Sequence, residues 1–373
     1  MKLKHLPPCL VSGILLSVSS CIQDDFLNAE CDIVGVDSVW TKNNRHILIG
    51  DPVITNSAVN FTVKKGTDRS GLNPSFYLTP GGSMRDNGGI RDFSKPQTYT
   101  VYSEDGNWSK NYTISFNYPI PTNTASFEHF ELDQSGRYYT WYEIDGTDSS
   151  NPRRDIWSSG NAGFAITGMG KTPDSFPTTV DPEGFAGHGV RLTTCSTGSF
   201  GRMLGMPIAG GNLFIGDFKA EKATSNPLTA TRLGKPGIVS GQPVSISGYY
   251  KYQPGPVFTG KNAEPIPDRT DIFDIYAVLY EVNPDNFEPL DGSNSLTSER
   301  IVSLARILNP KVADTWTAFE IPFTELQRFD REKLKNNGYA LTIVITSSRD
   351  AAYFEGAVGS TLHIDEVKIT WKE

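Results

Sequence analysis

The sequence predicts an all-β protein with two modules, an N-terminal immunoglobulin-like β-sandwich followed by a jelly-roll β-sandwich. Three observations predict this fold class. Aromatic residues make up 11% of the 373 residues, and Gly (35) and Pro (24) are both abundant. Short segments of alternating apolar and polar residues recur along the chain, and helical periodicity is nearly absent. Frequent turn residues between short, β-prone segments favour strands joined by loops over long helices.

The first 20 residues are expected to be a cleaved lipoprotein signal peptide. Two lysines precede a short apolar run, Leu10–Val18, which cannot span a bilayer. The segment Val18-Ser19-Ser20-Cys21 then has the small residues that precede a lipidated cysteine. An ordinary signal peptide with an incidental cysteine is the alternative. We expect Cys21 to be lipidated and to become the mature N-terminus.

Residues 21–30 are expected to form a tether to the outer membrane. The acidic pair Asp24-Asp25 lies close behind the cysteine. This pattern resembles the surface-export tag of outer-membrane lipoproteins in glycan-degrading gut bacteria. The resemblance implies a protein that faces the cell exterior and is attached to the membrane by its acyl chains.

Residues 31–118 are expected to form the immunoglobulin-like module. Val59–Val63, Tyr99–Tyr102 and Tyr112–Phe116 alternate apolar and polar residues, as half-buried strands do. The segment from Phe93 to Phe116 resembles the small immunoglobulin-like modules that precede functional domains in bacterial surface lipoproteins, which implies a spacer. The proline-bearing residues 119–125 are expected to be the linker to the second module.

Residues 126–373 are expected to form the jelly roll, because many short strands and long Gly/Pro loops follow one another without a βαβ rhythm. One helix is expected, within residues 324–335, as a solvated turn. The expected strands are Phe164–Thr167, Gly189–Cys195, Leu213–Phe218, Val244–Tyr252, Ile272–Val282, Ile301–Leu308, Trp316–Phe323, Leu341–Ser347 and Leu362–Trp371.

Two of these strands carry aromatic residues on a polar face. Side chains alternate between the faces of a strand, so Val244, Ile246, Tyr250 and Tyr252 are expected in the core. If the two strands are neighbours, their other faces form one surface on which sugar rings could stack, while charged groups bind the hydroxyls. Packing of the same tyrosines under loops is the alternative. The expected surface consists of Tyr249, Lys251, Asp274, Tyr276 and Tyr280.

The last strand predicts a β-bulge. Leu362 and Ile364 share one parity, but the later apolar residues take the other, so the phase changes at Asp365-Glu366. Jelly-roll carbohydrate modules often hold a structural calcium near the last and first strands. Asp365 with Glu128 or Glu131 could supply part of such a site. An acidic surface strand is the alternative explanation, and no cofactor is expected to be required.

The second module contains seven sequence phrases, at residues 157–161, 211–216, 248–255, 275–280, 341–348, 356–362 and 364–367. Together these phrases resemble the PCMD family of carbohydrate metabolism domains found in bacterial surface lipoproteins. The resemblance covers residues 126–373 and implies a jelly roll, an upstream immunoglobulin-like module and a role in glycan use. It carries over no catalytic pair. Trp157 and Asn161 lie in one of the phrases, and Trp157 is either a sugar platform or a core residue.

Three function classes remain open. Binding of carbohydrate needs only an aromatic platform, polar groups and the membrane anchor, and other glycan-utilisation proteins are possible partners. A glycoside hydrolase needs two facing carboxyls. A structural or adhesive surface protein is the third class. A formal charge of −8 and a pI of 5.3 argue against nucleic acid as a partner. The acidic residues considered for hydrolysis are Asp271, Asp274, Glu281 and Glu355.

Overall fold

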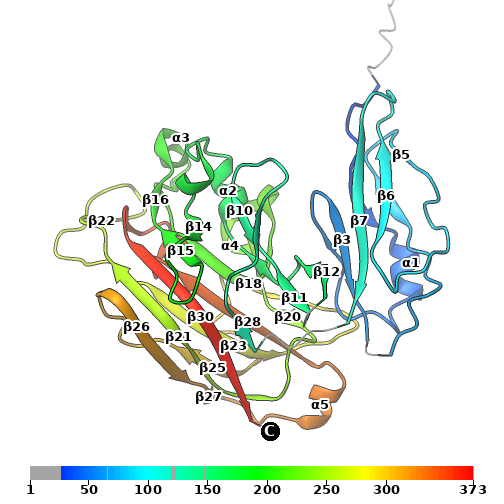
Figure 1. Cartoon of the computed structure of the whole chain (residues 1–373). Helices are drawn as coiled ribbons and strands as arrows, with labels where there is room; N and C mark the ends of the chain where they lie inside the picture. Colours follow the sequence, from blue (N-terminus) through cyan, green and yellow to red (C-terminus); the bar gives the residue numbers. More distant parts are fainter. Residues whose placement is uncertain (1–26, 65, 119–122, 146–147, 373) are drawn as a thin grey trace, which may run out of the picture.

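The computed structural model describes residues 27–64, 66–118, 123–145 and 148–372. It contains two β modules, which Figure 1 shows side by side, and its helices are short. The all-β fold class is confirmed. Cys21 and the signal peptide lie outside the described residues. Within the described part, no helix is long and apolar enough to cross a membrane.

The N-terminal module is an immunoglobulin-like sandwich around an aromatic core. Trp40, Phe61 and Phe116 pack at its centre, with the rings of Phe61 and Phe116 stacked 4.2 Å apart. β1 (Ile33–Val36) pairs with β4 (Phe76–Leu78) in the smaller sheet. The larger sheet has the order β2 (Val53–Ile54), β3 (Ala58–Thr62), β7 (Ser109–Asn117), β6 (Gln97–Tyr102) and β5 (Ser83–Met84).

Contacts between the modules include two hydrogen bonds in the described part of the chain. Arg153 forms a buried ion pair with Asp155 and also donates a hydrogen bond to the Tyr118 carbonyl at 3.0 Å. Gly50 N–H donates to the Pro284 carbonyl at 3.3 Å. Residues 119–122 of the expected linker lie outside the described part.

The C-terminal module is a jelly roll whose larger sheet holds nine strands. Their order is β24 (Leu290–Asp291), β19 (Thr231–Leu233), β18 (Asn212–Phe218), β28 (Tyr339–Thr346), β23 (Asp274–Glu281), β25 (Ile301–Arg306) and β27 (Thr324–Glu325), with β13 (Trp157–Ser158) beside β18 and β20 (Lys235–Pro236) beside β28.

The smaller sheet of the jelly roll holds six strands. Their order is β14 (Thr178–Asp181), β15 (Gly189–Thr193), β30 (Thr361–Lys372), β21 (Gln242–Gln253) and β26 (Ala313–Pro322), with β8 (Thr124–Ala125) beside β30. Ile246 and Leu362 of this sheet belong to the same buried core as Ile275 and Ile343 of the larger sheet. The two sheets therefore face each other, and each has an outer face.

Short elements complete the module. Four small antiparallel pairs lie outside the main sheets: β9 (Phe130–Leu132) with β10 (Tyr139–Trp141), β11 (Glu143–Asp145) with β12 (Asp148–Arg153), β16 (Cys195–Ser196) with β17 (Ile208–Ala209), and β22 (Phe258–Thr259) with β29 (Gly356–Ala357). The helices of the described residues are α1 (Ser38–Asn43), α2 (Asn161–Ala165), α3 (Gly198–Met203), α4 (Pro227–Ala230), α5 (Arg331–Lys335), η1 (Pro173–Ser175), η2 (Ala220–Lys222) and η3 (Ala351–Tyr353).

The expected β-bulge in β30 is confirmed. The pairing of β30 with β21 shifts between Ser247 and Tyr249, and Glu366 has a positive φ of 52°. A second shift lies between Pro243 and Ser245. It leaves Val244 45% exposed, so the expectation that Val244 lies in the core is wrong.

One local prediction is wrong and another is confirmed. The strand expected at residues 164–167 does not form, because Phe164 and Ala165 belong to α2, where both are buried. The solvated helical turn expected within residues 324–335 is α5, which has no buried residue, and β27 takes the first two residues of that range. Asp330 caps α5 by accepting hydrogen bonds from the amides of Glu332 and Lys333.

Candidate functional site

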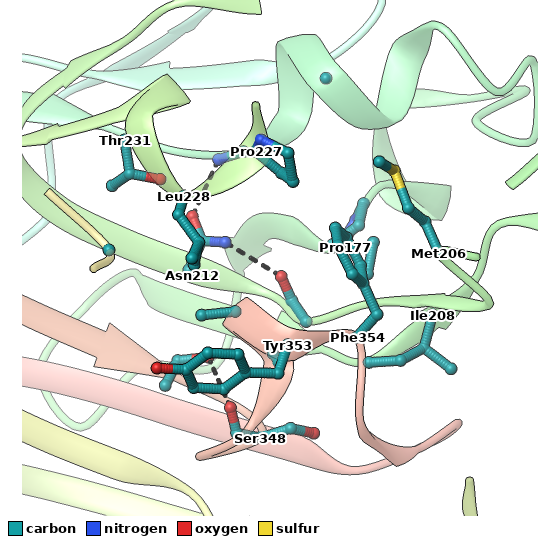
Figure 2. Close-up of a pocket in the computed structure, with 18 of the residues that line it drawn as sticks. Pro177, Met206, Ile208, Asn212, Pro227, Leu228, Thr231, Ser348, Tyr353 and Phe354 are labelled. Carbon is teal, nitrogen blue, oxygen red and sulfur yellow. Dashed lines mark hydrogen bonds between the residues drawn. The ribbon is translucent and has the colours of Figure 1, made fainter. Parts of the chain in front are cut away.

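A pocket of about 330 Å³ lies on the outer face of the nine-stranded sheet (Figure 2). Its floor comes from β18, β23, β25 and β28, and its walls come from α2, α3, α4 and the segment 348–354. The floor side chains alternate with the core residues of the same strands. Phe214, Tyr276 and Val344 therefore face away from the sandwich core, which receives Leu213, Ile215, Ile275 and Ile345.

Much of the wall is apolar. Tyr353 is 56% exposed and lies at the pocket with Phe354 and Ser348, as Figure 2 shows. It ends the 3₁₀ turn η3, and the following Phe354 has a left-handed backbone with φ of 63°. The other large apolar side chains of the wall are Phe164, Ile166, Phe200, Leu204, Met206, Ile208, Phe218, Leu228 and Leu296.

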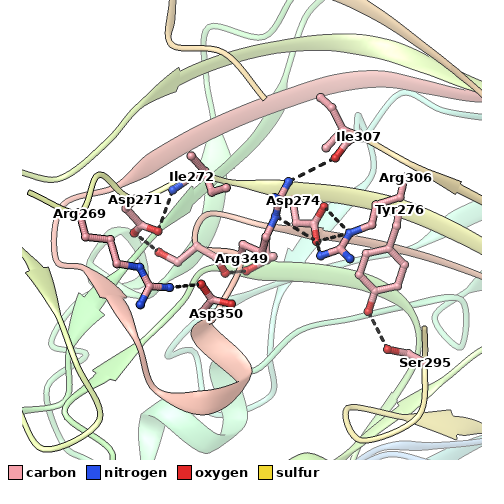
Figure 3. A network of polar contacts seen from close by, with 12 residues as sticks. Arg269, Asp271, Ile272, Asp274, Tyr276, Ser295, Arg306, Ile307, Arg349 and Asp350 are labelled. Carbon is pink, nitrogen blue, oxygen red and sulfur yellow. Dashed lines mark hydrogen bonds and ion pairs between the residues drawn. The ribbon is translucent and has the colours of Figure 1, made fainter. Parts of the chain in front are cut away.

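The polar part of the pocket is built around Asp274, which is 2% exposed. Arg306 donates hydrogen bonds to both of its carboxylate oxygens, the shortest at 2.6 Å (Figure 3). Arg349 Nε lies 3.7 Å from the same carboxylate, is buried and makes no hydrogen bond within the described structure. Two guanidinium groups thus share one buried carboxylate, which leaves donor capacity on Arg349.

A second ion network lies beside the first. Arg269 pairs with Asp350 at 2.6 Å and with Glu355 at 3.3 Å, and its guanidinium lies 3.9 Å from the centre of the Phe258 ring. Asp350 lines the pocket immediately before η3. These contacts hold the segment that carries Tyr353.

Asp271 anchors the other end of this segment. Its carboxylate accepts hydrogen bonds from Ser348 Oγ at 2.5 Å, Ala357 N at 2.7 Å and Ser360 Oγ at 2.7 Å. Burial raises the pKa of Asp271 above its ordinary value, although these donors act to lower it. Asp271 is 2% exposed and does not line the pocket. Its position predicts a structural role.

The carboxylates considered for hydrolysis thus all have partners in the protein. Asp271 holds a loop, Asp274 binds two arginines and Glu355 binds Arg269. Glu281 pairs with Lys333 at the surface. Asp274 is the one member of this set that lines the pocket.

The expected common surface of Tyr249, Lys251, Asp274, Tyr276 and Tyr280 does not form. β21 and β23 belong to different sheets, which face each other across the core. The prediction assumed that the two strands were neighbours, and that assumption is wrong.

Tyr276 and Tyr280 are also too buried to be open platforms. Tyr276 lines the pocket floor at 8% exposure, and its hydroxyl lies 3.1 Å from Ser295 Oγ. Burial raises its pKa to about 12. Tyr280 is fully buried and donates a hydrogen bond to the Leu233 carbonyl at 2.7 Å.

Trp157 and Asn161 have structural positions. Trp157 is 5% exposed in the sandwich core and donates a hydrogen bond from Nε1 to Glu143 Oε1 at 2.6 Å. Burial raises the pKa of Glu143 to about 7. Asn161 is fully buried and exchanges two hydrogen bonds with the backbone of Thr178. Of the two roles expected for Trp157, sugar platform or core residue, the structure therefore shows the core residue.

The three acids expected near a calcium ion bind protein groups. Glu128 accepts from the amide of His188 at 2.9 Å and lies 3.0 Å from its Nδ1. Glu131 pairs with Arg154, and Asp365 accepts from Ala186 N at 3.0 Å. No group of three or more His, Cys, Asp or Glu side chains with metal-ligand geometry occurs in the described part of the chain. The structural calcium stays a prediction.

Sequence reasoning missed the arginines and the tyrosine of the pocket. Arg306 and Arg349 reach Asp274 from 32 and 75 positions away, and only the pairing of β23 with its neighbours brings them together. Tyr353 lies in a loop and belongs to no alternating pattern. Its nearest sequence signal is Arg349-Asp350, a charged pair that follows a mostly apolar strand after two serines.

Comparison with known proteins gives two family matches. Residues 126–370 match the family model PCMD, described as "Putative carbohydrate metabolism domain", which confirms the resemblance predicted above. Residues 49–115 match the model of the SGBP N-terminal domain. No curated protein matches the chain.

Two solved structures are similar over their whole length. One is a protein of Bacteroides thetaiotaomicron titled a "putative glycoside hydrolase", with 41% identity, a TM-score of 0.84 and coverage of 94% of this chain and 99% of that one. The other, from Bacteroides vulgatus and given the same description, has 40% identity, a TM-score of 0.61 and coverage of 68% and 99%.

Proposed function

Because the chain belongs to the PCMD family, we propose that it binds glycan in the pocket on the outer face of the nine-stranded sheet. The observation that carries the proposal is the composition of this pocket. An exposed tyrosine and a largely apolar wall lie next to Arg306, Arg349 and Asp274. A sugar ring needs both kinds of contact, since its C–H face packs on aromatic rings and its hydroxyls bind charged groups.

The pocket has the size and the preorganisation for this role. About 330 Å³ lies within the range of small-molecule sites, near its lower end. Arg306 is held by its bidentate contact with Asp274, and Arg349 donates to the Ile307 carbonyl at 3.2 Å. Groups that are fixed before binding lose less entropy when the ligand arrives.

The contacts of the acidic residues in the pocket favour binding over hydrolysis. A glycoside hydrolase needs two carboxyl groups that face each other across the substrate. Asp274 and Asp350 are the acidic residues among the described lining residues. Asp274 pairs with Arg306 and Arg349, and Asp350 pairs with Arg269, so both carboxylates are already engaged by arginine.

The place of action forms part of the proposal. The lipobox ending at Cys21 and the acidic residues behind it support a lipid-anchored protein on the outside of the outer membrane. The N-terminal module would then hold the jelly roll away from the membrane. Glycan at the cell surface is the expected partner.

Affinity electrophoresis tests the proposal. The mature chain is run through gels that contain galactan, arabinan, xylan, mannan, pectin, starch or mucin, and the retained glycan is then titrated calorimetrically. Tyr353→Ala should weaken binding about fivefold to tenfold, the effect of losing one aromatic contact of about 1 kcal/mol. Arg349→Gln should weaken it further, because an amide cannot replace the charged fork.

Tyr102→Ala is the matched control, since Tyr102 is 45% exposed on the other module. The control should bind like the wild type. Unchanged binding by both pocket variants would contradict the proposed site. The appearance of new reducing ends in a retained polysaccharide would contradict a purely binding role and favour the hydrolase alternative.

A further inference from the structure

We propose that the jelly roll has a second glycan-binding surface, on the outer face of the six-stranded sheet, with Phe185 as its stacking residue. This surface lies on the opposite side of the sandwich from the pocket. It consists of Phe185, Tyr249, Lys251, Trp316, Asp181 and His363, and we call it the aromatic shelf.

A stacked pair of rings forms the centre of the aromatic shelf. Phe185 lies parallel to Tyr249, with ring centroids 3.6 Å apart and an angle of 7° between the planes. Tyr249 is half-buried on β21 and supports one face of Phe185, which is itself 45% exposed. One face of the Phe185 ring is therefore covered, and the exposed area belongs to the rest of the ring. A flat, supported and exposed ring suits the C–H face of a sugar.

Polar groups lie beside this pair. Trp316 contacts Phe185 edge-on at 6.3 Å between centroids, and Lys251 Nζ lies 4.4 Å from the centre of the Trp316 ring. The Asp181 carboxylate lies 2.6 Å from His363 Nδ1 and 3.9 Å from Lys251 Nζ. These side chains offer both donors and acceptors to sugar hydroxyls.

The loop that carries Phe185 is fixed from two sides. It spans residues 182–188 between β14 and β15. Asp365 accepts a hydrogen bond from the amide of Ala186, and Glu128 accepts one from the amide of His188. Two of the acids predicted as calcium ligands thus hold this loop, and the bulge in β30 lies directly beside Asp365.

A glycan fits the aromatic shelf better than a protein partner. A stable protein interface covers about 800 Å² on each partner and has an apolar centre. Phe185, at 45% exposure, is the most exposed ring of the shelf, and Lys251 and Asp181 lie on the side of its neighbour Trp316. The exposed apolar area matches a sugar ring, and the surrounding groups match its hydroxyls.

The test uses the mature chain and the panel of polysaccharides named above. Phe185→Ala should weaken binding of the retained polysaccharide about 3- to 10-fold. Phe185→Trp keeps an aromatic ring and should bind within about twofold of the wild type. Leu308→Ala is the control, because Leu308 is 80% exposed and neither lines the pocket nor belongs to the aromatic shelf. Circular dichroism checks that each variant is folded.

The double variant Phe185→Ala/Tyr353→Ala separates the two sites. If the pocket and the aromatic shelf both bind glycan, the gel should retain the double variant less than either single variant. Wild-type affinity of Phe185→Ala, or equal weakening by Leu308→Ala, would overturn the aromatic shelf and leave the pocket proposal intact. Loss of glycan binding in Phe185→Ala but not in Tyr353→Ala would support the aromatic shelf and contradict the pocket as a glycan site. Retention of none of the polysaccharides, or capture of a protein partner lost in Phe185→Ala without glycan binding, would also overturn the shelf.

Discussion

Replacing Asp274 by asparagine should destabilise the C-terminal module, because this carboxylate neutralises two guanidinium groups in a buried position. Asp274 is 2% exposed, and its partners Arg306 and Arg349 have side chains that are 31% and 23% exposed. Asparagine keeps the volume and one acceptor oxygen but removes the charge. The two cations then face each other without an anion between them.

The size of the loss follows from this burial. Removing one partner of a fully buried ion pair costs about 3–5 kcal/mol. Here water reaches both arginines in part, and we expect about 2–3 kcal/mol after allowing for solvent screening. For a module of this size that corresponds to a fall in Tm of about 5–10 °C.

Urea unfolding, followed by tryptophan fluorescence, measures the loss. Asp285→Asn is the matched control, because Asp285 is exposed on the same module, and its effect should stay within about 0.5 kcal/mol. If Asp274→Asn also changes the free energy of unfolding by no more than about 0.5 kcal/mol from the wild type, the reasoning is refuted. It would mean that the arginines are stable without the carboxylate.

Four further predictions concern the loop and the anchor. Gly187→Ala should lower the free energy of unfolding by about 1–2 kcal/mol more than Gly136→Ala does. Both glycines have positive φ, but only at Gly187 would the new Cβ meet the Glu128 carboxylate. Equal urea midpoints for the two variants would contradict the clash. Burial raises the pKa of Asp365 to about 6, so the folded state binds a proton more readily than the unfolded state. The stability of the wild type relative to Asp365→Asn should therefore decrease as pH rises from 4 to 6; a flat difference would refute the shift. Cys21→Ser should move the protein from the detergent phase to the aqueous phase in a phase-separation assay; unchanged partition would exclude lipidation there. The predicted calcium should raise the Tm when added to chelator-treated protein, and an unmoved Tm would leave Glu128 and Asp365 with the loop contacts alone.

Alternation along single strands was a sound guide to the fold. The apolar phase change at Asp365-Glu366 predicted the bulge in β30, because the number of residues between inward-facing side chains changes there. Parity also placed Ile246 and Tyr250 in the core correctly. These features depend on neighbours in the sequence, and the sequence shows those neighbours directly.

The candidate site depends on pairings that alternation does not contain. Parity tells which residues of a strand share a face, but it does not tell which sheet the strand joins. Tyr249 and Tyr276 were therefore placed on one surface, although the core separates their sheets. Phe185 was missed for a similar reason, since a loop residue has no period and its stacking partner is 64 positions away.

A crystal structure of the mature chain with an oligosaccharide of the retained glycan tests the central claim most directly. The account predicts a sugar ring against Tyr353 in the pocket of the nine-stranded sheet, with a hydroxyl bonded to Arg349. An empty pocket in crystals soaked above the measured Kd, with the sugar bound elsewhere, would contradict it.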